Sequence, residues 1–352
     1  MIPVEQMRLL GAGGYNERHT KMVIFGEIQT FVCYTFYFVK IYSQISDFVP
    51  PRFPVVTTGT FDGVHHGHRQ IIDRLRETAR KNNGETVLLT FFPHPRMVLF
   101  PDQHQVLLNT PEEKKQLLEK AGIDHLVVHP FTREFSMLSS KEFIEQILVN
   151  KFNTKKLVIG YDHHFGRNRE GSFDHLREFG PVYGFEVEEI PAHEVEHEKV
   201  SSTRIRHALQ TGDVRTAAAY LGYRYPLSGT VVKGRQLGRT IGFPTANLVP
   251  DNAYKLIPAD GVYAVFVQRG NETLPGMMNI GLRPTVDQGL SRTLEVHLPG
   301  FSGDLYGETL KVTFVERLRD EQKFGSLDLL KEQLENDRKH TLTLLRNEKT
   351  AL

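Results

Sequence analysis

The sequence predicts two domains: an N-terminal α/β domain built on a doubly wound parallel sheet, and a C-terminal antiparallel β-barrel with a C-terminal helix. From Val55 to about Ile190, strand patterns alternate with helical patterns, as they do in βαβ units. After Tyr223, strand patterns follow one another without helices between them, which is typical of a small antiparallel barrel. A length of 352 residues suits two domains of ordinary size.

The elements of the first half follow in chain order. The strand pattern of residues 54–61 leads into a helical pattern over 68–84, where Gly84 is the expected C-cap. A capping box, Ser139-x-x-Glu142, opens another helix. The remaining segments are strands at 85–92, 124–129, 155–160 and 185–190, with a helix starting at Thr110 and another over 139–152.

The second half begins with a helical stretch over 202–222, which we expect to connect the two domains. The barrel strands are expected at residues 229–234, 261–270, 275–281, 293–298 and 310–318. An amphipathic pattern over 326–345 predicts the helix that covers the barrel.

Composition excludes several classes of protein. Hydrophobic residues make up 39% and charged residues 24%, as in ordinary globular proteins. The formal net charge of +1 does not favour a nucleic-acid partner. The single cysteine, Cys33, excludes an internal disulfide framework and fits a reducing, cytoplasmic setting. The apolar run Phe31–Val39 is too short to span a bilayer, so no membrane partner is expected.

Residues 1–39 fit neither structural pattern. The stretch "GAGGYNERHT" reads as a loop, and its glycines miss the GxGxxG spacing. The first well-patterned segment begins at about Lys40. We interpret residues 1–39 as a leader, either a disordered extension or translated sequence upstream of the usual start.

The string "GTFDGVHHGH" at residues 59–68 is the strongest candidate for chemistry. A glycine-containing turn from a strand into a helix N-terminus makes an anion site, because unpaired N–H groups point outward there. His65 and His68 are three apart and would share one face of the first turn. The chain has no GxxxxGK[ST] loop, so this turn is the best phosphate device for ATP. A zinc site is the alternative, with His94 or His163 as a third ligand.

This string resembles the HxGH signature of the class I-like nucleotidyltransferases. Three further stretches lie at strand ends or helix starts: "TFFPHPR" (90–96), "GYDHHFGRNREG" (160–171) and "VSSTRIR" (200–206). Together they resemble the adenylyltransferase domain of the prokaryotic bifunctional riboflavin kinase/FAD synthetases. In the second half, residues 229–248 and 293–324 resemble the PTAN region and the catalytic-glutamate region of riboflavin kinase.

The resemblance covers about residues 40 to 345. It implies an FMN adenylyltransferase domain over 40–209, a connecting helix over 210–223 and a riboflavin kinase domain over 224–352. It also implies phosphorylation of riboflavin to FMN, followed by adenylyl transfer from ATP to give FAD and pyrophosphate. ATP is then the co-substrate, Mg²⁺ the cofactor, and flavins the substrates and products. A homo-oligomer is compatible with the sequence.

In the first domain, the resemblance implies that His65 and His68 hold the ATP phosphates. Arg206 would offset charge on the leaving pyrophosphate. Asp162 would contact ATP and the flavin, and His163 stands where the family usually has an aromatic residue. His94 would lie near the flavin or phosphate path, or would serve only as a turn residue between two prolines. The remaining triphosphate contacts implied are Ser201, Ser202 and Thr203.

In the second domain, Glu295 is the implied general base for the riboflavin 5′-hydroxyl, with a solvated strand glutamate as the alternative. Thr245 and Asn247 alternate along one strand and would offer Mg²⁺ two oxygen ligands from the same side. Three glycines would let the backbone approach phosphate, namely Gly234, Gly238 and Gly242. The weaker phosphate or flavin candidates are Arg292, Arg317 and Arg319.

Two other functions stay open at this point. Another HxGH transferase, such as a pantetheine-phosphate, nicotinamide-nucleotide or glycerol-phosphate enzyme, would lack the PTAN half. A non-enzymatic flavin-binding regulatory module would have decayed catalytic positions, which the presence of His65, His68, Thr245, Asn247 and Glu295 opposes.

Overall fold

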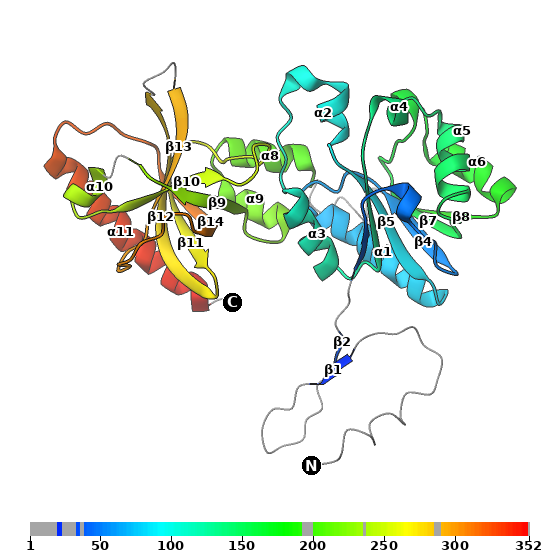
Figure 1. Cartoon of the computed structure of the whole chain (residues 1–352), viewed down its shortest axis with the longest axis horizontal. Helices are drawn as coiled ribbons and strands as arrows, with labels where there is room; N and C mark the ends of the chain where they lie inside the picture. The colour runs from blue at the N-terminus through cyan, green and yellow to red at the C-terminus, as the bar shows by residue number, and fades with distance from the viewer. Residues whose placement is uncertain are drawn as a thin grey trace, which may run out of the picture.

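The computed structural model describes residues 20–22, 33–35, 39–191, 200–234, 237–284 and 290–350. Figure 1 shows two bodies side by side, one around an open sheet and one around a barrel. Strands β1 (Thr20–Met22) and β2 (Cys33–Thr35) form a small antiparallel pair. Apart from these strands and Val39, the predicted leader lies outside the described residues. Among the described helices, none combines the length and apolarity needed to cross a bilayer.

The N-terminal sheet is parallel and has the order β3-β6-β5-β4-β7-β8, which confirms the doubly wound prediction. After β4 the chain adds β5 and β6 on one side and then returns to add β7 and β8 on the other. The carboxyl ends of β4 and β7 therefore flank the topological switch point, where open α/β sheets bind ligands. The strands are β3 (Lys40–Tyr42), β4 (Pro54–Thr58), β5 (Glu85–Phe91), β6 (His125–His129), β7 (Lys156–Gly160) and β8 (Glu186–Ile190).

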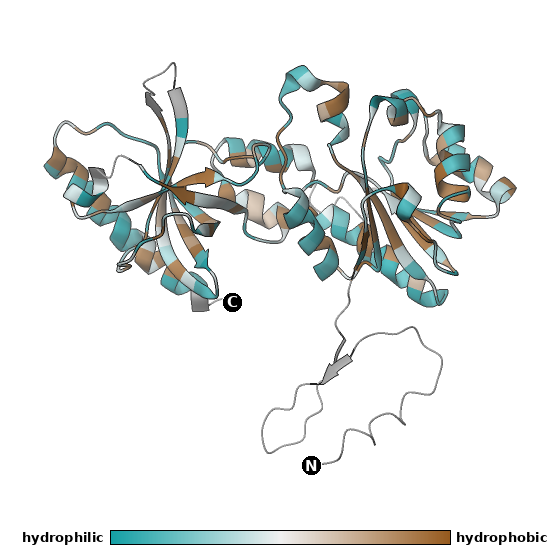
Figure 2. Cartoon of the chain, viewed as in Figure 1, coloured by the Kyte–Doolittle hydropathy of each residue, from teal (hydrophilic) through white to brown (hydrophobic). Residues whose placement is uncertain are grey.

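Helices cover both faces of this sheet. Val55 faces the cluster that contains Ile72 of α1, whereas Val56 faces the cluster that contains Ile147 on the opposite side. This alternation follows from the two-residue period of a strand. The elements are η2 (Ile45–Asp47), α1 (His66–Lys81), α2 (Pro95–Leu99), η3 (Pro101–Gln103), α3 (Pro111–Lys120), α4 (Arg133–Ser136), α5 (Ser140–Glu142), the π-helix η4 (Phe143–Val149), η5 (Arg167–Arg169) and α6 (Phe173–Tyr183). Figure 2 shows the hydrophobic residues gathered on the strands and the helix faces that cover them.

One local prediction in this domain is wrong, and another is confirmed with a difference in helix type. Gly84 is not the C-cap of α1, because the helix ends at Lys81 with Asn82 as its cap, and Asn83 takes the left-handed conformation at φ 48°. Gly84 instead lies against Phe53, whose carbonyl oxygen would be 2.4 Å from a Cβ at that position. The predicted Ser139 capping box is confirmed, but the helix continues as the π-helix η4.

The connecting stretch is two helices rather than one, α8 (Ser202–Gln210) and α9 (Val214–Leu221). The break lies at Gly212, which has a φ of +82°, and α9 begins at Val214. Asp213 is the N-cap, since its carboxylate accepts a hydrogen bond from the N–H of Thr216 at 3.0 Å.

The C-terminal domain is a closed antiparallel barrel in the order β10-β13-β12-β11-β14-β9. Its interior contains Leu294 and Val296, and Leu345 of helix α11 packs outside on Ala264 and Phe266. The barrel strands are confirmed, although the short helix α10 (Leu237–Thr240) interrupts the run that was expected to lack helices. The elements are β9 (Pro226–Val232), β10 (Thr245–Pro250), β11 (Gly261–Arg269), β12 (Glu272–Pro284), β13 (Leu290–His297), β14 (Thr309–Arg319) and α11 (Leu327–Thr350).

Candidate active sites

The two motif histidines lie together at the switch point. His65 is the N-cap of α1, and its Nδ1 accepts a hydrogen bond from the backbone N–H of His68 at 3.4 Å. The two imidazole rings stack with their centroids 3.7 Å apart, as the three-residue spacing suggested. Because Nδ1 of His65 is an acceptor, Nε2 carries the proton of the neutral ring and is available as a donor.

Both imidazoles are neutral near pH 7. Burial lowers the pKa of His65 from 6.5 to about 4 and places the pKa of His68 well below its usual value. Lys114 lies beside this loop, and its Nζ donates a hydrogen bond to the carbonyl oxygen of Thr60 at 2.8 Å. Burial lowers the pKa of Lys114, and the Asp62 carboxylate opposes this shift. Lys114 was missed from the sequence, because its helix gives no local sign that it faces this loop.

Asp62 is a second residue that the sequence reasoning missed, although it stands within the quoted motif. Its side chain is almost completely buried and accepts hydrogen bonds from the N–H groups of Leu108 and Asn109 at 3.1 and 3.2 Å. It also pairs with Arg206, with 2.5 Å between Oδ2 and Nη2. Arg206 additionally donates from Nε to the carbonyl of Val106 at 3.1 Å. The guanidinium is therefore positioned by Asp62 beside the histidine loop.

The other residues predicted from "VSSTRIR" divide into two kinds. Ser202 lies at the loop, where its hydroxyl donates to the backbone carbonyl of Asp62 at 2.8 Å. Ser201 is the N-cap of α8 and accepts from the N–H of Arg204 at 3.3 Å, so its hydroxyl is used by the helix. Thr203 is exposed on the first turn of the same helix.

His94 forms a hydrogen bond within its own turn and also interacts electrostatically with the Asp62 carboxylate. It is the N-cap of α2, with Nδ1 accepting from the N–H of Arg96 at 3.1 Å. Burial lowers its pKa to about 4, against the opposing effect of the Asp62 carboxylate. His94 therefore caps the turn into α2, as the alternative interpretation predicted, and it also lies near Asp62 at the candidate site.

The segment after β7 brings Asp162 and His163 to the other side of the switch point. Asp162 is exposed in a turn. His163 lies across the end of β4, with 3.2 Å between its Nε2 and the hydroxyl of Thr58, and its ring stacks on Phe165. Across the part of the chain that the structure describes, no three His, Cys, Asp or Glu side chains form a group suited to a metal ion. The zinc alternative therefore finds no third ligand beside His65.

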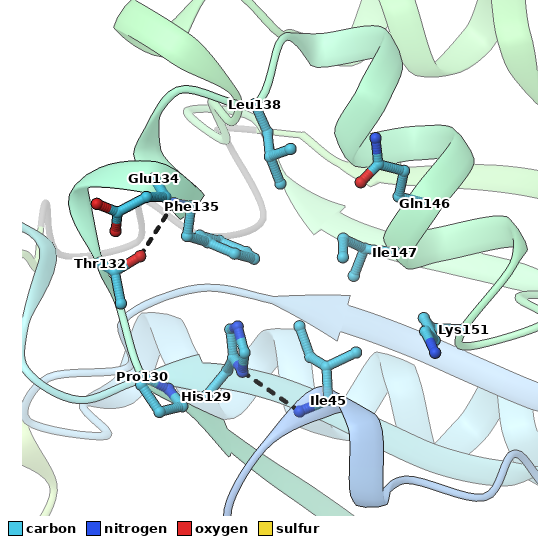
Figure 3. A pocket seen from close by; sticks show the side chains of 10 residues that line it. All are labelled: Ile45, His129, Pro130, Thr132, Glu134, Phe135, Leu138, Gln146, Ile147 and Lys151. Atoms are coloured by element: carbon cyan, nitrogen blue, oxygen red, sulfur yellow. Dashed lines mark hydrogen bonds between the residues drawn. The ribbon is translucent and has the colours of Figure 1, made fainter.

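A pocket of about 510 Å³ opens at the carboxyl end of β6. Figure 3 shows apolar side chains from three segments pointing toward it, including Ile45, Phe135 and Ile147. His129 lies at its base, where Nδ1 accepts from the N–H of Ile45 at 3.3 Å. Lys151 lies at its edge. The sequence reasoning missed this pocket, because its lining comes from separate stretches that share no motif.

The second candidate site lies on the outer face of the barrel. Asn247 of β10 is directly opposite Glu295 of β13, and the hydroxyl of Thr245 donates to Glu295 Oε2 at 3.1 Å. Leu294 and Val296 point into the barrel interior, so the predicted alternation is confirmed. Glu295 is only 8% exposed, and the alternative of a solvated strand glutamate is therefore wrong.

The glycine-rich segment lies close to these side chains. A Cβ at Gly234 would be 2.1 Å from Nδ2 of Asn247, so any larger residue there requires the Asn247 side chain to move. A Cβ at Gly238 would be 2.1 Å from the carbonyl oxygen of Phe243. Gly242 has a φ of +85°, which favours glycine for conformational reasons.

The predicted arginines form ion pairs with carboxylates other than that of Glu295. Arg292 pairs with Asp260 at 2.6 Å and, by strand alternation, lies on the face of β13 opposite to Glu295. Arg319 pairs with Asp337 of α11 at 2.8 Å, and Arg317 donates to the carbonyl of Asp260.

Asn279 of β12 is directly opposite Glu295 on the other flank, and it was missed from the sequence. Its Nδ2 donates to Glu321 Oε1 at 3.2 Å. Asn279 and Glu321 therefore add a polar amide and a second carboxylate to the flank of the Glu295 site. The strand pattern of "PGMMNIG" could have identified Asn279 only if the pairing of β12 with β13 had been known.

Comparison with known proteins gives two family matches in chain order. Residues 50–204 match the FAD synthetase family, and residues 221–345 match the riboflavin kinase family. Proteins named bifunctional riboflavin kinase/FMN adenylyltransferase are similar over most of their length. The protein from Escherichia coli (strain K12) is 41% identical, covering 80% of this chain and 90% of that protein. The one from Bacillus subtilis (strain 168) is 36% identical, covering 83% of this chain and 93% of that protein.

A solved structure is similar over the same two domains. A crystal structure named as a macrolide-efflux protein from Streptococcus pneumoniae has a TM-score of 0.79 and 35% sequence identity. The match covers 86% of this chain and 98% of the other. The sheet and the barrel therefore recur together in a protein of similar sequence.

Proposed function

This chain belongs to the bifunctional riboflavin kinase/FMN adenylyltransferases, and on that premise we propose that its two reactions run at two separate sites built from the residues described above. Riboflavin is phosphorylated to FMN, and FMN is adenylylated to FAD. We assign adenylyl transfer to residues 40–209 and riboflavin phosphorylation to residues 224–352, with 210–223 as the connection. The observation that carries this assignment is the separation of His65 and Glu295 onto the open sheet and the barrel.

In adenylyl transfer, a phosphate oxygen of FMN attacks the α-phosphorus of ATP, and the bond to the leaving pyrophosphate breaks. Neutral His65 and His68 suit this step as hydrogen-bond donors to the phosphates. A neutral ring avoids the free-energy cost of removing a charged group from water. Lys114 and Arg206 are the cations beside them that would offset charge on the pyrophosphate. Ser202 supports the same loop through Asp62. Asp162 and His94 remain proposed contacts at the edges of this site.

In riboflavin phosphorylation, Glu295 accepts the proton of the 5′-hydroxyl as the hydroxyl oxygen attacks the γ-phosphorus of ATP and ADP leaves. The buried position of Glu295 and its hydrogen bond from Thr245 support this role. Thr245 and Asn247 offer the hard oxygen atoms that Mg²⁺ prefers, on the face that Gly234 keeps open. Mg²⁺ bound there would supply positive charge to the phosphates of ATP.

The pocket at the end of β6 is the proposed place for the flavin ring of FMN during adenylyl transfer. It lies at the carboxyl edge of the same sheet as His65, and its volume of about 510 Å³ is in the range of small-molecule sites. Phe135 and Ile147 provide apolar contact for a flat aromatic ring. A cytoplasmic location and assembly into a homo-oligomer remain predictions, the first resting on the single cysteine.

The test separates the two reactions. Replacing both His65 and His68 by Ala should abolish conversion of FMN to FAD and leave phosphorylation of riboflavin within about twofold of wild type, because the barrel site is untouched. Each reaction is followed by chromatography of the flavins, with FMN supplied directly for the second. Equal loss of both activities in a folded protein would contradict two separate sites.

A further inference from the structure

We propose that Tyr223, the last residue of the connection, and Lys255, in the riboflavin kinase domain, are positioning residues of the adenylyl-transfer site in the first domain. Both lie within the segment that matches the riboflavin kinase family and outside the FAD synthetase match. Both nevertheless donate hydrogen bonds to the backbone around the histidine loop. The proposal rests on the function proposed for His65 and His68.

Tyr223 is bonded to the loop that presents the histidines. Its hydroxyl donates to the carbonyl of Gly63 at 2.7 Å and accepts from Nδ2 of Asn109 at 3.0 Å. Gly63 lies two residues before His65, has a φ of +91°, and would place a Cβ 2.8 Å from Leu108. This tight loop conformation is therefore tied from outside its own domain by one hydroxyl group.

Lys255 holds the neighbouring segment. Its side chain is 2% exposed, and Nζ donates to the carbonyl of Leu108 at 2.8 Å and to Glu113 Oε2 at 2.6 Å. The ammonium also lies 4.2 Å from the ring centroid of Tyr225. Leu108 is thus held on its carbonyl side by Lys255 and on its N–H side by Asp62. A buried ammonium needs such partners, so this geometry is strongly constrained.

The backbone continues the same connection. The N–H of Leu107 donates to the carbonyl of Tyr254 at 2.7 Å, and the N–H of Leu256 donates to the carbonyl of Leu107 at 2.9 Å. Residues 106–109 therefore run beside the kinase residues 254–256. The same short segment provides the carbonyl of Val106 to Arg206 and two N–H groups to Asp62. Through this segment, the kinase part determines where the Asp62–Arg206 pair lies relative to His65.

The experiment compares two tyrosines whose hydroxyl groups donate hydrogen bonds to different backbone carbonyls. Tyr223→Phe removes the hydroxyl bound to Gly63, whereas Tyr225→Phe removes a buried hydroxyl that donates to Leu256 within the kinase domain at 2.8 Å. We expect Tyr223→Phe to lower kcat for FMN adenylylation by about tenfold, because small misplacements of reacting groups have large effects on rate. KM for ATP and riboflavin phosphorylation should stay within about twofold of wild type. Tyr225→Phe should lower the melting temperature comparably and keep wild-type adenylylation.

A second variant tests Lys255. Replacing Lys255 by Met together with Glu113→Gln removes both charges, so no carboxylate is left unpaired. It should reproduce the fall in adenylylation kcat while flavokinase turnover persists. The matched control is Arg269→Met, which breaks an ion pair with Glu308 that lies wholly in the barrel domain.

The outcomes are distinguishable. Wild-type adenylylation in both Tyr223→Phe and the Lys255/Glu113 double variant would overturn the proposal. So would a loss in both tyrosine variants that simply follows their melting temperatures, since that indicates a general structural role. His65→Ala serves as the reference. Full adenylylation in that variant would instead remove the function proposed for the histidines.

Discussion

The hydroxyl of Thr245 donates a hydrogen bond to Oε2 of Glu295 across the paired strands β10 and β13, with 3.1 Å between the two oxygens. The proposed metal-side residue and the proposed base are therefore in direct contact. Asn247 lies opposite Glu295 in the same register, and Gly234 passes beside Asn247. Substitutions in this group are expected to affect riboflavin phosphorylation and to spare adenylyl transfer.

Replacing Glu295 by Gln keeps the size of the side chain and removes its basic carboxylate. Flavokinase turnover should fall by about 10²–10⁴-fold, because positioned general bases typically contribute that much. KM for riboflavin should change far less, and adenylylation of supplied FMN should persist. Steady-state kinetics with riboflavin and, separately, with FMN measure both. Wild-type flavokinase turnover in the folded variant would exclude Glu295 as the base.

Replacing Thr245 by Ala removes an oxygen from the metal side and also the hydrogen bond to Glu295. The apparent Mg²⁺ requirement of riboflavin phosphorylation should rise, with a smaller fall in turnover than in Glu295→Gln. A magnesium titration at saturating riboflavin checks this. An unchanged magnesium dependence would argue against Thr245 as a ligand.

Replacing Gly234 by Ala should displace Asn247, because the added Cβ would lie 2.1 Å from its Nδ2. We expect a higher KM for MgATP in the flavokinase reaction and no change in adenylylation. Gly325→Ala is the control, since no heavy atom lies within 4 Å of a Cβ at that position. Equal KM values for the two variants would show that the Gly234 backbone does not shape this site.

Folding stability should depend on pH through the buried histidines. Burial lowers the pKa of His65, His94 and His163 from 6.5 to about 4. Below pH 6.5 the unfolded chain binds protons that the folded chain takes up only near pH 4, so stability is lost as the pH falls through this range. His163→Phe keeps the stack on Phe165 and should make the fall in melting temperature between pH 6.5 and 4 less steep. Superimposable pH profiles would contradict this.

Filling the pocket at the end of β6 tests its assignment to the flavin ring. Ile147→Trp should raise KM for FMN in adenylylation by about tenfold or more, which corresponds to about 1.4 kcal/mol of lost binding. KM for riboflavin in the kinase reaction should not change, since that site is in the barrel. Val182→Trp, at an exposed position of α6, is the control. An unchanged KM for FMN in Ile147→Trp would place the flavin ring elsewhere.

Deleting residues 1–38 should leave both activities and the melting temperature nearly unchanged. No motif lies in this part of the sequence, and the family matches begin at residue 50. Val39 is kept because it packs against the core that contains Val55 and Ile72. Thermal unfolding and both flavin assays on the shortened chain check this. A large fall in melting temperature would show that the deleted residues stabilise the core.

Several parts of this protein could be read from the sequence because their causes are local. The alternation of strands and helices, the helix start at Thr110, the capping box at Ser139 and the change of pattern after Tyr223 all follow from spacing within one segment. The sequence also shows that Thr245 and Asn247 lie on the same side of their strand, since alternate residues of a strand share a face. The two motif regions, residues 59–68 and 229–248, are contiguous in the sequence, so their resemblance to known families is visible without a structure.

Which distant residues complete each site depends on the packing of the folded chain. Asp62 and Arg206 are 144 positions apart, and Lys255 and Glu113 are 142 apart, so no periodicity relates either pair. Arg292 remains a predicted flavin contact, and only the register of the closed barrel shows that it lies on the face of β13 opposite to Glu295 and pairs with Asp260. These outcomes depend on how a sheet, a barrel and the segment between them pack together. Buried charges pair with the partners that this packing brings near, and those partners cannot be identified from the residues around each charge in the sequence.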